Sequence, residues 1–248
     1  PFEREAKPGA RLVVVCRHAR EKEVDRVIRI FAKYVYPSVE GATLTLVGDG
    51  PEHEALKELT KELGVDHRTY FVGEQGLKEI PAWYRHADLF VYASLSETYG
   101  QVISEALWCG LPVVAMNDGM GVAGQVTHGQ DGFLVDPQAA DADEVFGRHV
   151  EQLLTKQGLR TEMSAKAVSN AHDRSDPEVC VQRYLEVFEI AKDHAKRHPA
   201  RPSIKAYSGL ASWAGLHGMV AAMGLMRKPV ELNRNQAATG SWTFSPAT

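Results

Sequence analysis

The sequence predicts an α/β fold: a doubly wound, parallel, Rossmann-like sheet of about six strands, followed by a helical C-terminal tail. Between residues 12 and 135, short apolar runs alternate with segments whose apolar residues recur every three or four positions. This alternation is typical of right-handed βαβ units, which build parallel sheets. After residue 135 no strand-like run is clear, and the pattern becomes helical.

Six apolar runs are predicted to be the strands. Each is short and nearly continuously apolar, as in strands that are buried on both faces of a parallel sheet. The first run, Leu-Val-Val-Val-Cys, shows the pattern most clearly. The runs occupy residues 12–16, 44–47, 70–72, 89–92, 112–115 and 132–135.

Helices are predicted between the strands because the apolar side chains there fall on one face of a helix. A Gly-rich segment at residues 118–125 is expected to be a loop. Asp176, Pro177 and Glu178 suit the N-cap, the first helical position and the first turn of a C-terminal helix. The predicted helices lie near residues 24–32, 56–63, 80–84, 102–107, 142–157 and 177–196.

Composition narrows the class of protein. The 248 residues are 44% hydrophobic and 24% charged, as in soluble globular proteins. With 28 Lys and Arg against 32 Asp and Glu, the chain lacks the basic surplus that nucleic-acid binding needs. Cys16, Cys109 and Cys180 are too far apart for a zinc site or a disulfide framework, which favours a reducing compartment. The N-terminus lacks a signal-peptide pattern and an initiator Met, so we expect a cytoplasmic fragment.

Three regions are predicted along the chain. Residues 1–10 are expected to be a linker, residues 11–197 the Rossmann-like domain, and residues 198–248 an apolar Gly-rich helix with a loose polar end. Residues 206–226 contain no Asp, Glu, Lys or Arg and are long enough to span a membrane. Their four glycines favour a helix packed on protein, with peripheral association at the inner face of a membrane left open.

In a doubly wound sheet, ligands bind beyond the carboxyl ends of the strands. Arg17 and Lys22 follow the first strand, where a guanidinium and an ammonium suit a diphosphate; a solvated basic turn is the alternative. Gly48 begins a Gly-Asp-Gly-Pro turn after the second strand, which could bring backbone N–H groups close to a ligand or serve turn geometry alone. After the third strand, the backbone of Val72 and Gly73 could meet the edge of a base.

The strongest pattern follows the fourth strand, where Glu97 and Glu105 stand eight positions apart. Gly100 is predicted to open a helix, leaving the amides of Gly100, Gln101 and Val102 free to bind an anion. Glu105 could accept hydrogen bonds from vicinal ribose hydroxyls. Because it lies in an apolar run, we expect it to have a partner, with a solvent-facing Glu105 as the alternative.

Other chemistries are disfavoured. His18, His128 and His172 lack metal-ligand spacing and are interpreted as surface histidines or satisfied core histidines. No metal site is predicted. The chain has no Gly-x-Ser-x-Gly elbow, no Walker loop and no Gly-x-Gly-x-x-Gly after a strand, which argues against P-loop and hydride-transfer enzymes.

Taken together, residues 11–137 resemble the C-terminal, donor-binding half of retaining glycosyltransferases of the GT-B fold, the "glycosyltransferases group 1" family. Glu97 and Glu105 match that family's Glu-x7-Glu pair, and Arg17 with Lys22 matches its Arg-x4-Lys clamp. The turn at residues 48–51 matches its Gly-x-Gly-Pro, and residues 93–115 echo the phrase around its carboxylate pair.

The resemblance implies transfer of a hexosyl group from a nucleoside-diphosphate sugar to an acceptor hydroxyl, with UDP favoured over GDP or ADP. It implies no required metal or cofactor. Arg17 and Lys22 would hold the diphosphate together with the amides at residues 100–102, and Glu97 would touch the donor sugar. Glu105 would hold the ribose, while the backbone of residues 48 and 72–73 would contact the nucleotide.

The sequence departs from the family's pattern in two ways. Four positions carry residues other than those the family usually has, so the identity of the donor sugar is left open. They are Cys16, Glu23, Gln101 and Gln125. Nothing before Arg11 could supply the family's N-terminal Rossmann-like domain, so we expect half an enzyme, weak or inactive without that domain or a partner chain. The alternatives are a non-catalytic nucleotide-binding or assembly subunit and an epimerase of similar fold.

Overall fold

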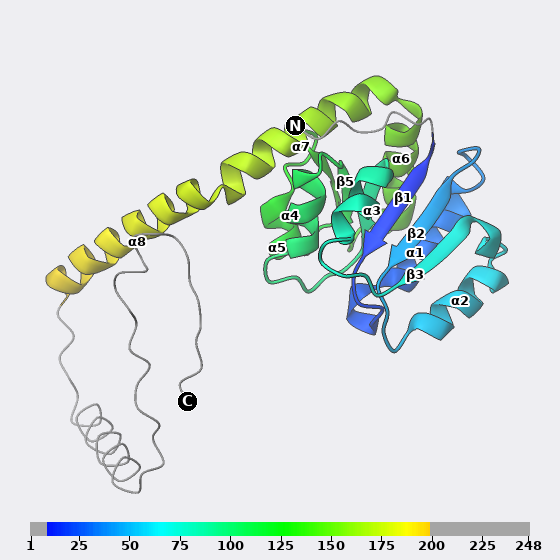
Figure 1. The fold of residues 1–248 in the computed structure, drawn as a ribbon, viewed down its shortest axis with the longest axis horizontal. Helices are drawn as coiled ribbons and strands as arrows, with labels where there is room; N and C mark the ends of the chain where they lie inside the picture. Colours follow the sequence, from blue (N-terminus) through cyan, green and yellow to red (C-terminus); the bar gives the residue numbers. More distant parts are fainter. Residues whose placement is uncertain (1–8, 199–248) are drawn as a thin grey trace, which may run out of the picture. The chain divides into compact units, whose positions relative to one another are not determined.

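Six parallel strands form one sheet in the order β3-β2-β1-β4-β5-β6 (Figure 1). The computed structural model describes residues 9–198. The predicted strands all occur, within one or two residues of the expected positions, which confirms the α/β doubly wound fold class. Their bounds are β1 Arg11–Val15, β2 Thr43–Val47, β3 Thr69–Gly73, β4 Leu89–Tyr92, β5 Val113–Met116 and β6 Gly132–Val135.

The strand order reverses between β1 and β4. The chain runs outward from β1 through β2 to β3, then returns to pair β4 with the other side of β1, where Leu12 lies opposite Leu89. From there it continues through β5 to β6. At such a switch point, the loops after the two central strands diverge and leave a crevice at the carboxyl edge of the sheet.

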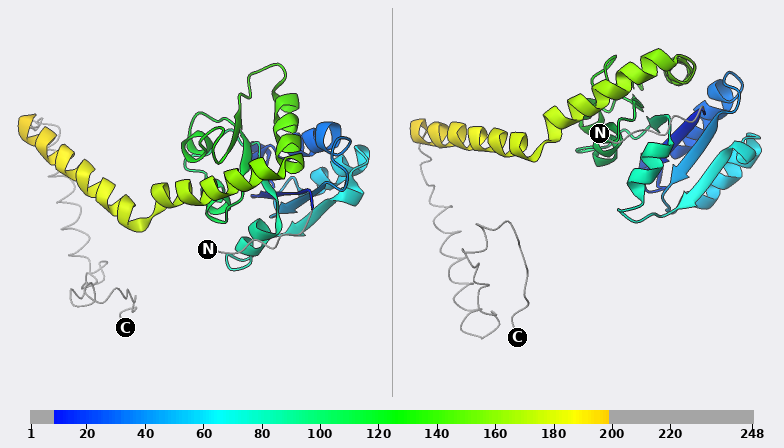
Figure 2. Two further views of the ribbon diagram at one scale, coloured as in Figure 1. Left: turned by 90° about the horizontal axis from the view of Figure 1, so that it is seen from above. Right: turned by 45° about the horizontal axis from the view of Figure 1, so that its top comes forward.

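Helices connect the strands. Figure 2 shows the sheet from two further directions, with the cyan β3 at one side and green helices toward the other. The first helix passes into a π-helical turn at Phe31–Val35. The helices are α1 Val24–Ile30, α2 His53–Glu62, α3 Ile80–His86, α4 Gln101–Trp108, α5 Gly121–Gln125, α6 Ala142–Thr155, α7 Gln157–Ser175 and α8 Pro177–Arg197, with short 3-10 turns η1 Arg20–Lys22 and η3 Asp66–Arg68.

Two helices were not predicted. α7 buries Met163, Ala167 and Ala171, a stripe four residues apart whose two alanines give little apolar signal. The stripe lies on the helix that packs against α4. α5 forms inside the Gly-rich segment because the Asp118 carboxylate accepts hydrogen bonds from the amides of Met120, Val122 and Ala123. Side-chain capping of this kind starts a helix that glycines alone would disfavour.

The start of α8 is the predicted one. Asp176 Oδ1 accepts hydrogen bonds from the amides of Glu178 and Val179 at 2.8 and 3.3 Å, as an N-cap does. The chain divides after Leu185, within α8, into two compact units, and the sheet lies wholly in the first. The expected linker up to residue 8 and the apolar segment 206–226 fall outside the described residues.

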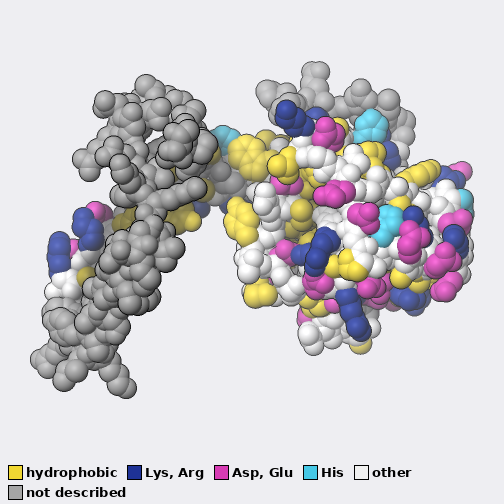
Figure 3. Space-filling model, turned by 60° about the horizontal axis from the view of Figure 1, so that its bottom comes forward, with side chains coloured by type: hydrophobic (Ala, Val, Ile, Leu, Met, Phe, Trp, Pro, Cys, Tyr) yellow, Lys and Arg dark blue, Asp and Glu magenta, His cyan; other side chains and the backbone are white. Residues whose placement is uncertain are grey.

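The described part of the chain contains no helix that is both long enough and apolar enough to cross a bilayer. On the face drawn in Figure 3, Lys and Arg side chains are interspersed with Asp and Glu. This face carries no extended basic patch of the kind that a phosphate backbone would need.

Candidate functional site

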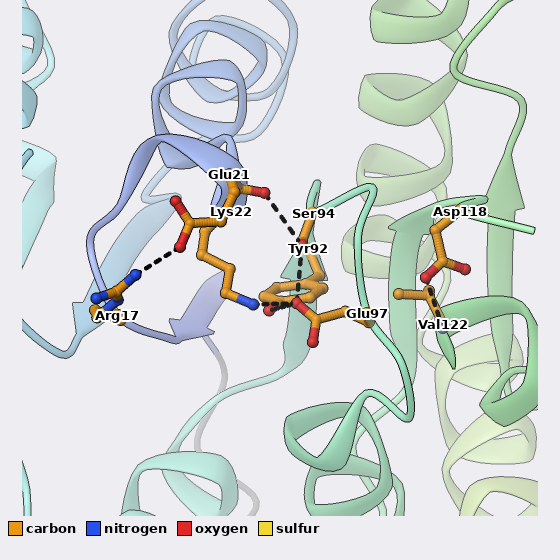
Figure 4. Close-up of polar contacts among 8 residues, drawn as sticks. All are labelled: Arg17, Glu21, Lys22, Tyr92, Ser94, Glu97, Asp118 and Val122. Carbon is orange, nitrogen blue, oxygen red and sulfur yellow. Dashed lines mark hydrogen bonds and ion pairs between the residues drawn. The ribbon is translucent and has the colours of Figure 1, made fainter. Parts of the chain in front are cut away.

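Lys22 and Glu97 meet across the switch point. Lys22 ends η1, in the connection after β1, and Glu97 lies in the loop after β4. The Lys22 ammonium forms an ion pair with Glu97 Oε1, and the two side chains are only 20% and 14% exposed (Figure 4). The reversal of strand order therefore brings a cation and a carboxylate together from positions 75 residues apart.

The two oxygens of Glu97 differ in their surroundings. Tyr92 and Ser94 each donate a hydroxyl hydrogen bond of 2.8 Å to Oε1, the same atom that Lys22 contacts. Among residues 9–198, no donor is recorded for Oε2. Burial opposes ionisation, but the hydrogen bonds from Lys22, Tyr92 and Ser94 outweigh it and lower the pKa of Glu97. The site thus holds a fixed carboxylate with one oxygen open to a ligand.

Arg17 is held differently from Lys22. Its guanidinium donates to Glu21 Oε1 at 2.7 Å, and its side chain is 66% exposed. Figure 4 shows this pair on the same loop as Lys22. Exposed ion pairs contribute only about 0.2–1 kcal/mol, so an arriving anion could take Arg17 from Glu21 at little cost.

The glycines of the turn after β2 serve close packing. A Cβ on Gly48 would lie 1.9 Å from the carbonyl oxygen of Cys16, and a Cβ on Gly50 would lie 2.4 Å from that of His18. The amide of Gly48 donates to the carbonyl of Gly73 at 2.8 Å. This turn therefore supports the loop that carries Arg17, in addition to whatever ligand contact Gly48 makes.

An open cleft of about 530 Å³ lies between the ends of β1 and β2 and the start of α3. Arg17 and Gly48 are in its lining, while Val72 and Gly73 are not. The Val72 carbonyl accepts a 3.4 Å hydrogen bond from the Gln75 side chain. The remaining lining residues are Val15, Cys16, Val47, Asp49, Gly50, Glu74, Gln75 and Ile80.

The start of α4 has free donors. Gly100 is the N-cap, with φ of 73°, and its carbonyl accepts from the amides of Ile103 and Ser104. In residues 9–198 the amides of Gly100, Gln101 and Val102 have no recorded acceptor. These groups and the helix dipole together suit an anion.

Glu105 is half-buried and has the partner that its apolar surroundings predict. The Tyr84 hydroxyl donates to Oε2 at 3.1 Å, and the side-chain amide of Gln101 donates to Oε1 at 3.2 Å. Burial raises the pKa of Tyr84, so its hydroxyl stays a donor. The carboxylate is thereby fixed one turn inside α4.

His18 corrects one prediction. It is neither a surface histidine nor a satisfied one: its side chain is fully buried, and within residues 9–198 Nε2 has no hydrogen-bond partner. Its Nδ1 lies 2.9 Å from Nδ1 of His53, whose ring packs against Phe71. Burial, and next the neighbouring His53, lower the pKa of His18 to about 4, against the opposing effect of Asp49.

Acid is therefore expected to destabilise the fold through His18. The unfolded chain takes up the proton near pH 6.5 and the folded chain only near pH 4, so the free energy of unfolding should fall across that window by up to roughly 3 kcal/mol. Urea denaturation at several pH values measures this. His18→Leu should flatten the slope, whereas the exposed His86→Leu should not; equal slopes in wild type and His18→Leu would contradict the assignment.

Sequence reasoning missed the residues that hold the two glutamates, namely Tyr84, Tyr92 and Ser94. The sequence did offer one signal for Tyr92: a tyrosine at the end of a buried strand carries a hydroxyl that needs a hydrogen-bond partner. Sequence reasoning also missed Asp118. Burial raises the pKa of this carboxyl, but hydrogen bonds from the backbone amides of Met120, Ala123 and Val122 outweigh burial, so the pKa is lowered. Within the described part of the chain, no group of three or more His, Cys, Asp or Glu side chains could hold a metal ion.

The fold is a doubly wound α/β sheet of the Rossmann-like class, with the candidate site at the carboxyl edge of that sheet. The family model described as glycosyl transferases group 1 matches residues 2–170. The chain belongs to this family.

Relatives of the chain are longer than it is. It is 30% identical over 184 residues to N-acetyl-alpha-D-glucosaminyl L-malate synthase of Bacillus anthracis, covering 73% of this chain and 46% of that protein. It is 39% identical over 125 residues to D-inositol 3-phosphate glycosyltransferase of Kribbella flavida, covering 50% and 28%. The chain thus spans less than half the length of these relatives.

Solved structures share the fold. HepE of Anabaena, in complex with UDP and glucose, superposes with a TM-score of 0.64 and 25% identity over 73% of this chain and 48% of that one. TarM of S. aureus, in a complex that includes UDP, superposes with a TM-score of 0.67 over 75% and 37%. At 17% identity the second likeness shows the fold alone.

Proposed function

We propose that this domain is the donor-binding half of a retaining glycosyltransferase that transfers a hexosyl group from a nucleoside-diphosphate sugar to an acceptor hydroxyl. The observation that carries the proposal is the meeting of Lys22 and Glu97 between the ends of β1 and β4. In a sheet of this topology, that position is where nucleotides bind.

The diphosphate is proposed to lie among three sets of donors. Lys22 and Arg17 supply positive charge, and the amides of Gly100, Gln101 and Val102 supply a helix N-terminus. As the bond to the sugar breaks, negative charge grows on the leaving diphosphate, and fixed donors stabilise it there. In this proposal the protein's own cations do the work that a metal ion does elsewhere.

The carboxylates are proposed to orient the rest of the donor. The open Oε2 of Glu97 accepts from hydroxyls of the sugar, and Glu105 accepts from the ribose hydroxyls. The nucleobase is proposed to lie in the cleft that Gly48 lines. The backbone of Val72 and Gly73 is beside Gly48, whose amide donates to the Gly73 carbonyl. For retention, an oxygen of the leaving diphosphate deprotonates the acceptor on the same face of the sugar, so positioning is the protein's main contribution.

UDP is the favoured nucleotide of this proposal. HepE, solved with UDP-glucose, is 26% identical over 73% of this chain, which supports UDP. GDP stays open because a relative named GDP-mannose-dependent alpha-(1-6)-phosphatidylinositol monomannoside mannosyltransferase is 33% identical over 142 residues. ADP is the third nucleotide to test.

A second, N-terminal Rossmann-like domain or a partner chain is proposed to complete the enzyme and to exclude water from the cleft. The exposed apolar side chains at the start of α8, Val181, Tyr184 and Leu185, support a further partner surface. We propose a cytoplasmic location and, as a further step, peripheral association with the inner face of a membrane. A relative named for lipopolysaccharide core biosynthesis, 32% identical over 151 residues, supports the membrane.

A non-catalytic nucleotide-binding subunit is the second candidate. It needs only the diphosphate-binding groups, namely Lys22, Arg17 and the start of α4, and no transfer step. Both candidates bind nucleotide, but only the first transfers sugar when the other half is supplied.

Calorimetric titration of the chain with UDP, GDP and ADP tests the proposal. One nucleotide is expected to bind with a dissociation constant between about 1 μM and 1 mM, or roughly −8 to −4 kcal/mol. Glu105→Ala should weaken this binding about tenfold or more because charged hydrogen bonds are lost, and Arg17→Ala should weaken it less. Glu54→Ala, on the exposed face of α2, is the matched control. A folded chain that binds none of the three nucleotides overturns the proposal.

A further inference from the structure

α5 lies directly against the loop that leads into α4. A Cβ on Gly121 would come within 2.4 Å of the Glu97 carbonyl oxygen and 2.7 Å of the Tyr99 nitrogen. The amide of Gly121 donates to that same Glu97 carbonyl at 2.8 Å. The first turn of α5 thus fixes the Glu97 carbonyl by a hydrogen bond and by close backbone packing.

The last residue of α5 fixes the next part of this loop. Gln125 is 6% exposed, and its side-chain amide donates to the carbonyl of Tyr99 at 3.2 Å. That carbonyl belongs to the peptide bond whose nitrogen is the amide of Gly100. A hydrogen bond at Tyr99 therefore sets the direction in which the first free donor of α4 points.

Arg174 holds α5 from the other side. Its guanidinium, on α7, contacts the Gln125 carbonyl and the Thr127 hydroxyl. The same guanidinium pairs at 3.1 Å with Asp131, whose side chain is fully buried. A second donor from α7, Asn170, binds Asp131 at 2.8 Å, and the amide of Thr127 binds it at 2.7 Å.

From this continuous set of contacts we propose that Gln125 and Arg174 are positioning residues for the donor diphosphate. Gln125 aims the peptide that begins the free N-terminus of α4, and Arg174 holds Gln125 in place from α7. Neither residue touches the diphosphate. The inference rests on the proposed donor site and extends it to a helix that lies behind that site.

The Gln125→Glu variant separates positioning from packing. It keeps the side chain's shape but presents a carboxylate oxygen to the Tyr99 carbonyl. It should therefore raise the hydrogen-exchange rate of the Ile103 and Ser104 amides, which donate to the Gly100 carbonyl, and weaken UDP binding about fivefold or more at pH 8. Toward pH 5 the introduced carboxyl takes up a proton and can donate again, so the affinity ratio to wild type should return toward one. The positive charge of Arg174 lowers the pKa of the introduced carboxyl, and the negative charges of Asp118 and Asp131 raise it. Gln157→Glu, at the exposed start of α7, controls for the added charge.

Arg174→Lys tests the second half of the inference. The ammonium still neutralises Asp131 but cannot also reach the Gln125 carbonyl and the Thr127 hydroxyl, so UDP binding should weaken severalfold while the melting temperature changes little. Arg160→Lys is the matched control: Arg160 is also on α7, and its guanidinium donates to the carbonyls of Leu153 and Leu154, at the end of α6.

The exchange measurement needs no nucleotide, which keeps the two proposals apart. If wild type binds UDP and both variants match it in exchange and affinity, the positioning roles are overturned and the donor site stands. If wild type binds no nucleotide but Gln125→Glu speeds exchange of the Ile103 and Ser104 amides, the donor site is overturned while the link from Gln125 to the start of α4 holds. Unfolding of both variants would overturn the inference, because the contacts would then belong to general packing.

Discussion

Gly48→Ala is expected to lower the free energy of unfolding by about 3 kcal/mol or more, the largest stability effect that we expect from a methyl group added to a glycine within residues 9–198. The added Cβ would lie 1.9 Å from the Cys16 carbonyl oxygen, a backbone atom that cannot rotate away, at a residue whose φ is 130°. Left-handed strain and overpacking each cost about 1–3 kcal/mol. Urea denaturation measures the sum.

Gly64→Ala is the matched control for that substitution. Gly64 also has a positive φ, of 68°, but nothing lies within 4 Å of the point that an added Cβ would occupy. The substitution should therefore cost about 1 kcal/mol from backbone conformation alone. Equal losses in the two variants would show that the contact between the β2 turn and the β1 loop contributes nothing.

Lys22→Met is expected to weaken UDP binding by about 10- to 100-fold, the value of a lost charge-assisted hydrogen bond of about 1.5–3 kcal/mol. It should also lower stability by about 1–3 kcal/mol, because Glu97 is left as a poorly solvated carboxylate without its cation. Calorimetry measures the UDP affinity, and urea denaturation measures the free energy of unfolding.

The double variant that combines Lys22→Met with Glu97→Gln separates these two effects. Removing the unpaired charge should restore most of the stability, since the introduced amide stays hydrogen-bonded to the neutral hydroxyls of Tyr92 and Ser94, while UDP affinity stays low. Lys57→Met, which loses an exposed ion pair with Glu54 on α2, should change neither quantity. Recovery of UDP affinity in the double variant would contradict a direct role for Lys22.

The sequence predicted those parts of the fold whose signals are local. The strand at residues 89–92 and the helix after Gly100 could be predicted because burial and helix capping determine which residue types occur within a few positions. α7 was not predicted because its buried stripe consists largely of alanine. α5 depends on a side-chain cap from Asp118, which a Gly-rich pattern conceals.

The candidate site was predicted as a set of residues and not as a set of contacts. Glu97, Glu105, Arg17 and Lys22 were all singled out, yet their spacing could not show that Lys22 pairs with Glu97 while Arg17 pairs with Glu21. Nor could it show that His18 Nε2 has no partner among residues 9–198, since burial of this ring against His53 and Phe71 is a property of the folded chain. The two ion pairs and the burial of His18 all depend on how the folded chain packs, which spacing in the sequence does not show.

The ion pair between Lys22 and Glu97 also constrains the order in which this chain can acquire a working site. Its partners are separated by 75 positions. The strands β1, β2 and β3 can pair with one another before β4 docks on β1. Closing so long a loop is slow compared with forming neighbouring βα units. Formation of this pair during refolding would therefore report the docking of β4 on β1, the step that joins the two halves of the sheet.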